Sequence, residues 1–334
     1  MKKISIIIPV YNGSEYIESC ILSCETQNLD KNEFEIIVVN DGSTDNTLHI
    51  LSSLCSSFKN IKIINVTNQG QSVARNIAIQ YVEAEYMWFV DADDCISYNC
   101  LSKIYEILKS NDLDALCVYK DANVSFIKDA VDTSIRSSEI VNGEIYLTNY
   151  TPVTVAPWGY VFSKEFWNSH DFMFIPGIYY EDAQLIPIVL SYVNKICVID
   201  SCAYYNYITR NGSTMLSPIN NKKIKGRMEI VNTHLRHSKI METSRLRNYF
   251  NLSATYSYIE GIKISGLMNG LAGINNFCES IIEKPKQDYP SENVLKKLLC
   301  KLFLRNPQLA YIVYSKIARI KKILSYTFLT TNNA

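Results

Sequence analysis

Tyr86-Met-Trp-Phe-Val-Asp-Ala-Asp-Asp94 is the stretch that decides the fold class of this chain. Five apolar or aromatic residues are followed at once by a carboxylate-rich turn, which is typical of a buried strand that ends at a polar edge. The run contains no alternating polar residues, so both of its faces are expected to be covered. Strands of this kind belong to parallel sheets packed between helices.

The first 120 residues repeat this pattern of strand and turn. Short runs rich in β-branched or aromatic residues predict strands at Ile4–Val10, Phe34–Asn40, Ile61–Val66, Tyr86–Val90 and Asp114–Tyr119. Runs with apolar residues at helical spacing predict helices at Ser14–Gln27, Thr44–Ser57, Gln71–Val82 and Asn99–Lys109. The alternation predicts an α/β fold, in which ligands bind at the carboxyl ends of the strands.

The composition excludes several classes of protein. The 334 residues include 33 basic and 33 acidic side chains, so no overall field points to nucleic acid as a partner. No two of the ten cysteines have Cys-x-x-Cys spacing, and most lie in apolar stretches, which predicts reduced, buried thiols in a cytoplasmic protein. The apolar run that ends at Val10 is too short for a signal peptide, and no run is long enough for a membrane-spanning helix.

The turns after the predicted strands lack the glycine-rich motifs that bind phosphates. Gly13 stands alone after the first strand, so neither a dinucleotide-binding fingerprint nor a P-loop is present, and the chain has no Gly-x-Ser-x-Gly elbow. The missing phosphate loop also disfavours a nucleotidyltransferase, which would place paired acids on a similar sheet.

The acids after Val90 predict a site for a divalent cation. Asp91 and Asp93 point the same way along an extended chain, where two unneutralised carboxylates repel each other. Mg²⁺ or Mn²⁺ would relieve this repulsion, bind substrate phosphates and neutralise the charge on a departing diphosphate. The same spacing occurs at Asp112/Asp114, but only Asp91 and Asp93 follow a buried strand directly.

Four ordered motifs resemble the successive signatures of family-2 glycosyltransferases. They are Ser5-Ile-Ile-Ile-Pro-Val-Tyr-Asn12, Val38-Val-Asn-Asp-Gly-Ser-Thr-Asp45, Gly70-Gln-Ser-Val-Ala-Arg-Asn76 and Phe89-Val-Asp-Ala-Asp-Asp94. A looser likeness continues through Pro157-Trp-Gly-Tyr-Val-Phe162, Glu181-Asp182 and Tyr204-Tyr-Asn-Tyr207. The resemblance implies a GT-A fold, a Rossmann-like and mostly parallel sheet flanked by helices, in residues 1–217. Its donor half would be 1–120 and its acceptor half 121–217.

The resemblance also implies which residues bind the donor nucleotide sugar, a UDP-linked one. They are Pro9, Tyr11, Asn12, Asp41, Arg75, Asp91 and Ala92. Tyr11 would lie against the base, Asp41 would accept a hydrogen bond from it, and Arg75 would reach the base or the diphosphate. Asp93, together with Asp91, would ligate Mn²⁺ or Mg²⁺, with Asp94 as a helper.

The resemblance implies an inverting transfer to a hydroxyl of a glycan or lipid-linked acceptor in cell-surface polysaccharide synthesis. One carboxylate of the Glu181-Asp182 pair would take the hydroxyl proton, and Asp182 is the preferred choice because adjacent carboxylates raise one pKa. The pair would equally suit the start of a helix at Ala183–Val193. Trp158 and Tyr180 are candidate acceptor contacts.

A non-catalytic glycan- or nucleotide-binding module with the same fold is the alternative function. The presence of Asp91, Asp93 and the Glu181-Asp182 pair argues against it, because a binding module has no need of a catalytic acid set.

Residues 218–334 are predicted to be helical and resemble no named family. From Asn293 to Ala334 there are eight basic residues and no acidic one, and segments within 293–326 place apolar and basic residues on opposite sides. Such helices bind anionic membranes, which would hold the protein peripherally on the inner face of the cell membrane. Alternatively, they form a helical subdomain that docks its apolar side on the catalytic domain and leaves its basic face in solvent. His234 and His237 are expected at the surface, and the oligomeric state is not determined by the sequence.

Overall fold

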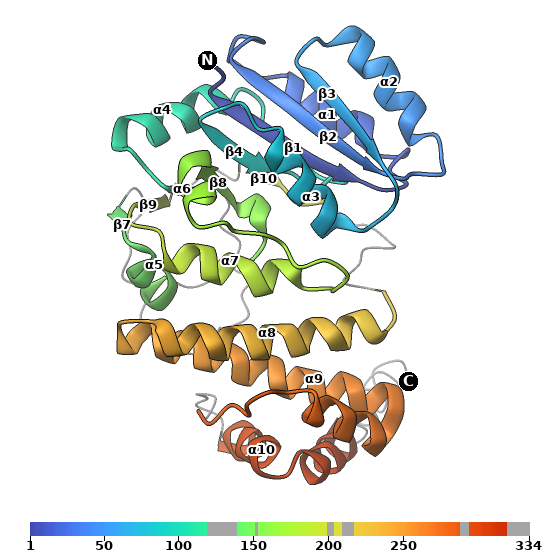
Figure 1. The fold of residues 1–334 in the computed structure, drawn as a ribbon, viewed down its shortest axis with the longest axis vertical. Helices are drawn as coiled ribbons and strands as arrows, with labels where there is room; N and C mark the ends of the chain where they lie inside the picture. The colour runs from blue at the N-terminus through green and yellow to red at the C-terminus, as the bar shows by residue number, and fades with distance from the viewer. Residues whose placement is uncertain (119–138, 151–152, 199–203, 209–216, 288–293, 319–334) are drawn as a thin grey trace, which may run out of the picture. The chain divides into compact units, whose positions relative to one another are not determined.

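The computed structural model describes residues 1–118, 139–150, 153–198, 204–208, 217–287 and 294–318 (Figure 1). The chain divides into two compact units, Met1–Ser217 and Pro218–Ala334. The first unit combines a sheet with helices, and the described part of the second unit is helical.

The first unit is built on a mixed sheet whose strand order is β3-β2-β1-β4-β8-β6-β9-β7 in the described residues. The strands are β1 (Ile4–Val10), β2 (Phe34–Asp41), β3 (Ile61–Val66), β4 (Tyr86–Phe89), β6 (Ala115–Cys117), β7 (Ile140–Val141), β8 (Tyr160–Ser163) and β9 (Ile196–Val198). A second, two-stranded sheet pairs β5 (Cys95–Ile96) with β10 (Tyr205–Asn206). The five predicted strands are confirmed as β1–β4 and β6.

The sheet departs from a purely parallel one at its central strand β8 and at its edge strand β7, which pairs antiparallel with β9. β3, β2, β1 and β4 are parallel, as the alternating pattern predicts. β8 was not predicted, because it is short and follows a proline-containing turn. It inserts antiparallel between β4 and β6.

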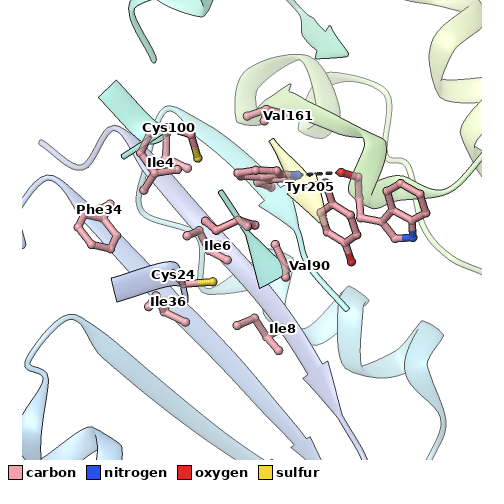
Figure 2. Packing of buried hydrophobic residues seen from close by; sticks show 14 of the residues in the cluster. Ile4, Ile6, Ile8, Cys24, Phe34, Ile36, Val90, Cys100, Val161 and Tyr205 are labelled. Carbon is pink, nitrogen blue, oxygen red and sulfur yellow. Dashed lines mark hydrogen bonds between the residues drawn. The ribbon is translucent and has the colours of Figure 1, made fainter. Parts of the chain in front are cut away.

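Helices connect these strands and cover both faces of the sheet. They are α1 (Ile17–Glu25), α2 (Thr47–Ser57), α3 (Gln71–Gln80), α4 (Leu101–Asn111), α5 (Gly143–Asn149), α6 (Lys164–Ser169) and α7 (Glu181–Ser191). Successive residues Ile6, Ile7 and Ile8 of β1 are all fully buried, so neither face of the strand is solvated. Figure 2 shows one face, where Ile6 lies close to Cys24 of α1.

The register brings the ends of the central strands to one edge of the sheet. Val10 of β1 pairs with Asn40 of β2, and Ile7 of β1 pairs with Phe89 of β4. Because the strands are parallel and nearly flush, the loops that follow β1, β2 and β4 begin side by side. These loops carry the residues predicted to bind the donor.

The second unit contains α8 (Asn221–Ile240), α9 (Ser244–Glu279) and α10 (Val294–Arg305), and residues 307–318 are also helical. Asn269 and Gly270 have non-helical backbone angles, which kink α9. The side chains of Asn220 and Thr243 cap the first turns of α8 and α9. None of the helices in the described segments combines the length and hydropathy that a membrane-crossing helix needs.

The basic helix α10 packs its apolar side inside its own unit. Cys300 and Phe303 are buried in a core shared with α8 and α9, while Lys296 and Lys297 are exposed. The buried residues of α10 thus pack against α8 and α9 of their own unit, a partner that neither sequence alternative named. The second predicted amphipathic segment extends into 319–334, which lies outside the described residues.

The prediction for two histidines of α8 is wrong. His234 and His237 are buried rather than exposed, and Nδ1 of His234 lies 2.9 Å from Oγ of Ser253. Burial lowers the pKa of His237 to about 4, so its ring is neutral in the folded chain. Both rings also contact Phe250, and they serve the core of this unit.

Candidate active site

The loop after β1 is tied to the loop after β2 by Asn12. The N–H of Asn12 donates to Oγ of Ser43 at 2.9 Å, and Oδ1 of Asn12 accepts the N–H of Thr44 at 2.8 Å. Asn12 has φ 49°, a left-handed conformation that asparagine tolerates better than most residues. Tyr11, directly before it, keeps a side chain that is 49% exposed at the edge of the sheet, next to half-buried Pro9.

Asp41 ties the end of β2 to the start of α3. Its buried carboxylate accepts the N–H groups of Gln69 and Gly70, each at 2.8 Å. Gly42 has φ +68°, and a Cβ there would lie 2.6 Å from the backbone N of Asn68, so only glycine fits this turn. Each oxygen of Asp41 accepts one N–H and retains acceptor capacity, and the predicted contact with a base stays a prediction.

Arg75 joins the acids of the β4 loop to those of α7. Its guanidinium donates from Nη2 to Oδ1 of Asp91 at 2.8 Å and from Nη1 to Oε1 of Glu181 at 2.7 Å. The same oxygen of Glu181 accepts a hydrogen bond from Nε2 of Gln71 at 2.6 Å. Arg75 and Glu181 are both buried, and the guanidinium lies over the ring of Phe174. The predicted donor-site arginine is therefore held between two carboxylates.

The group around Arg75 contains more carboxyl groups than positive charges. Burial alone would lower the pKa of Arg75, but the carboxylates of Asp91 and Glu181 raise it above its usual range. Burial raises the pKa of Asp91; Arg75 opposes the shift and Asp93 adds to it. One guanidinium thus faces an excess of carboxylates, because Asp182 also interacts electrostatically with Asp91 and Arg75.

Glu181 and Asp182 differ sharply in their surroundings. Glu181 is buried and engaged by Arg75 and Gln71, whereas Asp182 is half-buried and accepts the N–H of Ala183 at 2.7 Å. Burial and the neighbouring Glu181 carboxylate raise the pKa of Asp182 to about 7. A carboxylate with a pKa near neutrality and few hydrogen bonds is suited to accept a proton. Glu181 is suited to hold Arg75.

The backbone directly before this pair is strained. Tyr180 has φ 65° and ψ 30°, a left-handed conformation that costs an L-residue about 1–2 kcal/mol. Strain of this kind persists where the surrounding structure imposes it, commonly at active sites. The half-buried ring of Tyr180, a predicted acceptor contact, thus lies at the first turn of α7.

The carboxylates of the β4 loop do not share one environment. Asp91 and Asp93 are half-buried, and Ala92 between them is buried. Asp94 is 1% exposed and accepts hydrogen bonds from the Tyr205 hydroxyl at 2.6 Å and from the N–H of Ile208 at 2.8 Å. Burial raises the pKa of Asp94 to about 7. Asp94 is therefore engaged with the 204–208 segment.

The donor set fits a divalent cation that is shared with substrate phosphates. No cluster of three or more His, Cys, Asp or Glu able to hold a metal occurs among the residues that the structure describes. Asp91 and Asp93 supply hard oxygen ligands, and Mg²⁺ is commonly held by one or two carboxylates together with phosphates. The chain alone thus offers part of a coordination sphere, which a diphosphate would complete.

The predicted acceptor residue Trp158 is 5% exposed and has little surface left for a ligand. Its ring stacks on that of Tyr205, with centroids 4.5 Å apart and planes 8° apart. Gln71, Phe174 and Tyr205 also belong to this group of contacts, and none of them was predicted as a site residue. Tyr205 belongs to the Tyr204–Tyr207 motif, which was noted without a role. Gln71 lies in the Gly70–Asn76 motif but its contact with Glu181, like that of Phe174 with Arg75, joins segments distant in sequence and could not be predicted.

The sequence of the chain is similar to those of known glycosyltransferases. Residues 5–152 match the sequence model of glycosyl transferase family 2. The poly(ribitol-phosphate) beta-N-acetylglucosaminyltransferase TarS of Staphylococcus aureus (strain MW2) is 25% identical over 301 residues, or 85% of this chain and 50% of TarS. The poly(ribitol-phosphate) beta-glucosyltransferase of Bacillus spizizenii is 40% identical over 114 residues, or 34% of this chain and 18% of that protein. The chain thus spans at most about half the length of these relatives.

The likeness in fold extends through the helical unit. The crystal structure of residues 1–349 of S. aureus TarS with UDP-GlcNAc has a TM-score of 0.70 and 20% identity, covering 96% of this chain and 92% of that one. The predicted fold class, a GT-A α/β domain followed by a helical region, is confirmed. A match over 96% of the chain includes most of residues 218–334, for which the sequence motifs indicate no family.

Proposed function

Since residues 5–152 match the sequence model of glycosyl transferase family 2, we propose that this protein is an inverting glycosyltransferase that moves a sugar from a nucleoside-diphosphate donor to a hydroxyl group. The observation that carries the proposal is the Asp91–Arg75–Glu181 ion-pair group, which joins the carboxyl edge of the sheet to the start of α7. Through it, the proposed donor acids and the proposed base are held on one rigid set of elements, as direct displacement requires.

The donor nucleotide is proposed to be UDP. Tyr11 offers an exposed ring for stacking on the base, and Asp41 retains acceptor capacity for an imide N–H. A UDP complex of the structurally similar TarS fragment supports this choice.

Asp91 and Asp93 are proposed to hold Mn²⁺ or Mg²⁺ together with the donor diphosphate. A bound divalent cation would supply Lewis-acid stabilisation of the departing diphosphate. Arg75 keeps Asp91 in place and remains charged, so it limits repulsion between the acids of the site.

Asp182 is proposed to be the general base. Its carboxylate would accept the proton of the acceptor hydroxyl as the oxygen attacks the anomeric carbon, with no covalent sugar–enzyme intermediate. The N–H of Ala183 holds Oδ1, and a pKa of about 7 suits proton transfer at neutral pH. Glu181 orients the first turn of α7 through Arg75 and Gln71 rather than taking the proton itself.

The acceptor is proposed to be a hydroxyl of a glycan, a lipid-linked precursor or a polyol-phosphate surface polymer. Two relatives are named for poly(ribitol-phosphate), and a third is a teichoic acid poly(glycerol phosphate) polymerase. Binding to an anionic membrane through the exposed lysines of α10, and hence a peripheral location at the inner face of the cell membrane, remains part of the proposal.

A thermal-shift screen of nucleotide sugars with and without Mn²⁺ tests the donor. A ligand at one hundred times its Kd stabilises by about 2.7 kcal/mol, and a unit of this size gains about 2–4 °C per kcal/mol, so the donor should raise Tm by about 5–11 °C. A metal-dependent shift with one UDP-sugar is expected. Equal shifts with all nucleotides, or none, would count against the proposal. UDP release in the presence of an acceptor would separate an enzyme from a binding module.

A further inference from the structure

The Asp91–Asp94 turn after β4, here called the acid loop, is hydrogen-bonded to a tyrosine that has no role in the proposed chemistry. The hydroxyl of Tyr205 accepts the backbone N–H of Asp91 at 3.1 Å and donates to Oδ2 of Asp94 at 2.6 Å. Oδ1 of Asp94 accepts the N–H of Ile208 at 2.8 Å. The two ends of the Asp91–Asp94 turn are thus joined through one buried hydroxyl.

The segment that carries Tyr205 is itself fixed to the first unit. β10 pairs with β5, which directly follows the acid loop. The N–H of Ser97 donates to the carbonyl of Tyr204 at 2.8 Å, and the N–H of Tyr204 donates to the carbonyl of Val118 at 3.2 Å. The ring of Tyr205 is 1% exposed and stacked on Trp158. The hydroxyl therefore has little freedom to move away from the acid loop.

Asp91 is consequently held from both sides. Arg75 binds its side chain, and Tyr205 binds its backbone N–H. The turn is closed by the N–H of Asp94, which donates to the carbonyl of Asp91 at 3.1 Å. Since Asp91 and Asp93 repel each other, a backbone held in this way would keep both carboxylates at one spacing.

We propose that Tyr205 and Asp94 are positioning residues that hold the Asp91–Asp93 backbone in the geometry for a divalent cation bound with the donor diphosphate. This inference rests on the proposed function. Neither residue needs to contact the cation or the donor. Their role is that of the outer hydrogen-bond partners of metal ligands, whose loss commonly weakens metal binding by 10–100-fold.

The test is UDP binding by isothermal titration calorimetry, with and without Mn²⁺, in the full chain. Tyr205→Phe keeps the ring that stacks on Trp158 and removes the hydroxyl. It should reduce the gain in UDP affinity from Mn²⁺ by about tenfold, while UDP affinity without metal stays within about twofold. Tyr207→Phe is the matched control, because Tyr207 lies in the same segment and is 44% exposed. It should behave like the wild type.

A second variant shows whether the two residues act together. Asp94→Asn should also reduce the Mn²⁺ gain, and the double variant Tyr205→Phe/Asp94→Asn should lose little more than Tyr205→Phe alone, because both changes break one connection. Equal weakening of UDP with and without Mn²⁺, additive losses, or an unchanged Mn²⁺ gain would each overturn the inference. Failure of the wild type to bind UDP more tightly with Mn²⁺ would instead overturn the proposed function.

Discussion

Replacing Arg75 by methionine should destabilise the first unit strongly. Arg75 is buried and pairs at 2.7 Å with Glu181, whose side chain is 2% exposed, and at 2.8 Å with Asp91. Methionine keeps much of the length of the side chain and removes the charge. Removing one partner of a buried ion pair costs about 3–5 kcal/mol, because the remaining carboxylate is left uncompensated. The half-buried Asp91 can be solvated, so most of the cost should come from Glu181.

The expected change can be measured by thermal unfolding. One kcal/mol corresponds to about 2–4 °C in a domain of this size, so Arg75→Met should lower Tm by about 6–20 °C. All three tryptophans of the chain, Trp88, Trp158 and Trp167, lie in the first unit, so their fluorescence reports its unfolding selectively.

The pH dependence of the variant gives a second readout. Burial raises the pKa of Glu181 above its ordinary value of 4.5, and removal of Arg75 should raise it further. A carboxyl group with a raised pKa in the folded state binds its proton more tightly there than in the unfolded chain. The variant should therefore be least stable at neutral and higher pH, and its deficit should shrink as the pH falls toward about 5.

Two matched variants complete this test. Arg75→Met/Glu181→Gln removes the buried negative charge with the positive one, so it should recover much of the lost stability at pH 7. Lys103→Met removes an exposed pair with Glu106 and should change stability by less than about 1 kcal/mol. Two results would refute this explanation of the Asp91–Arg75–Glu181 ion-pair group. One is a Tm of Arg75→Met within about 2 °C of the wild type, and the other is a loss of stability that stays the same from pH 5 to pH 8.

Three further predictions concern single positions. Asp182→Asn should lower turnover at least about a hundredfold while donor affinity is retained, whereas Glu181→Gln should lower both the stability of the fold and the rate. A loss of donor binding in Asp182→Asn would show that Asp182 has a structural role instead. Asp93→Ala should abolish the Mn²⁺ dependence of UDP binding measured by calorimetry, and an unchanged dependence would remove Asp93 from the metal site. Gly143→Ala should destabilise by about 1–3 kcal/mol in thermal unfolding, because a Cβ there would lie 1.6 Å from the Leu190 carbonyl; a neutral effect would contradict this close packing.

The sequence was sufficient to predict the α/β domain and the edge of the sheet at which the candidate site residues lie. Buried strands are nearly continuous apolar runs, and the residue after each such run must lie at the carboxyl end of a parallel strand. Tyr11, Asp41 and Asp91 could therefore be placed together without a structure. The central antiparallel strand β8 could not, because a four-residue strand carries too little periodicity to identify its direction or neighbours.

Only the tertiary structure distinguished the surroundings of the acids. Glu181 and Asp182 are adjacent and chemically alike, but the first turn of α7 points one to Arg75 and leaves the other with a single backbone hydrogen bond. In the same way, the sequence suggests Asp94 as a third member of the proposed metal site, but in the structure its carboxylate accepts a hydrogen bond from Tyr205 of a distant segment. A local sequence pattern indicates which chemical groups are present and at which end of a strand they lie. Which partner each group meets depends on contacts between segments far apart in the chain, and these contacts set its charge, its burial and its freedom to react.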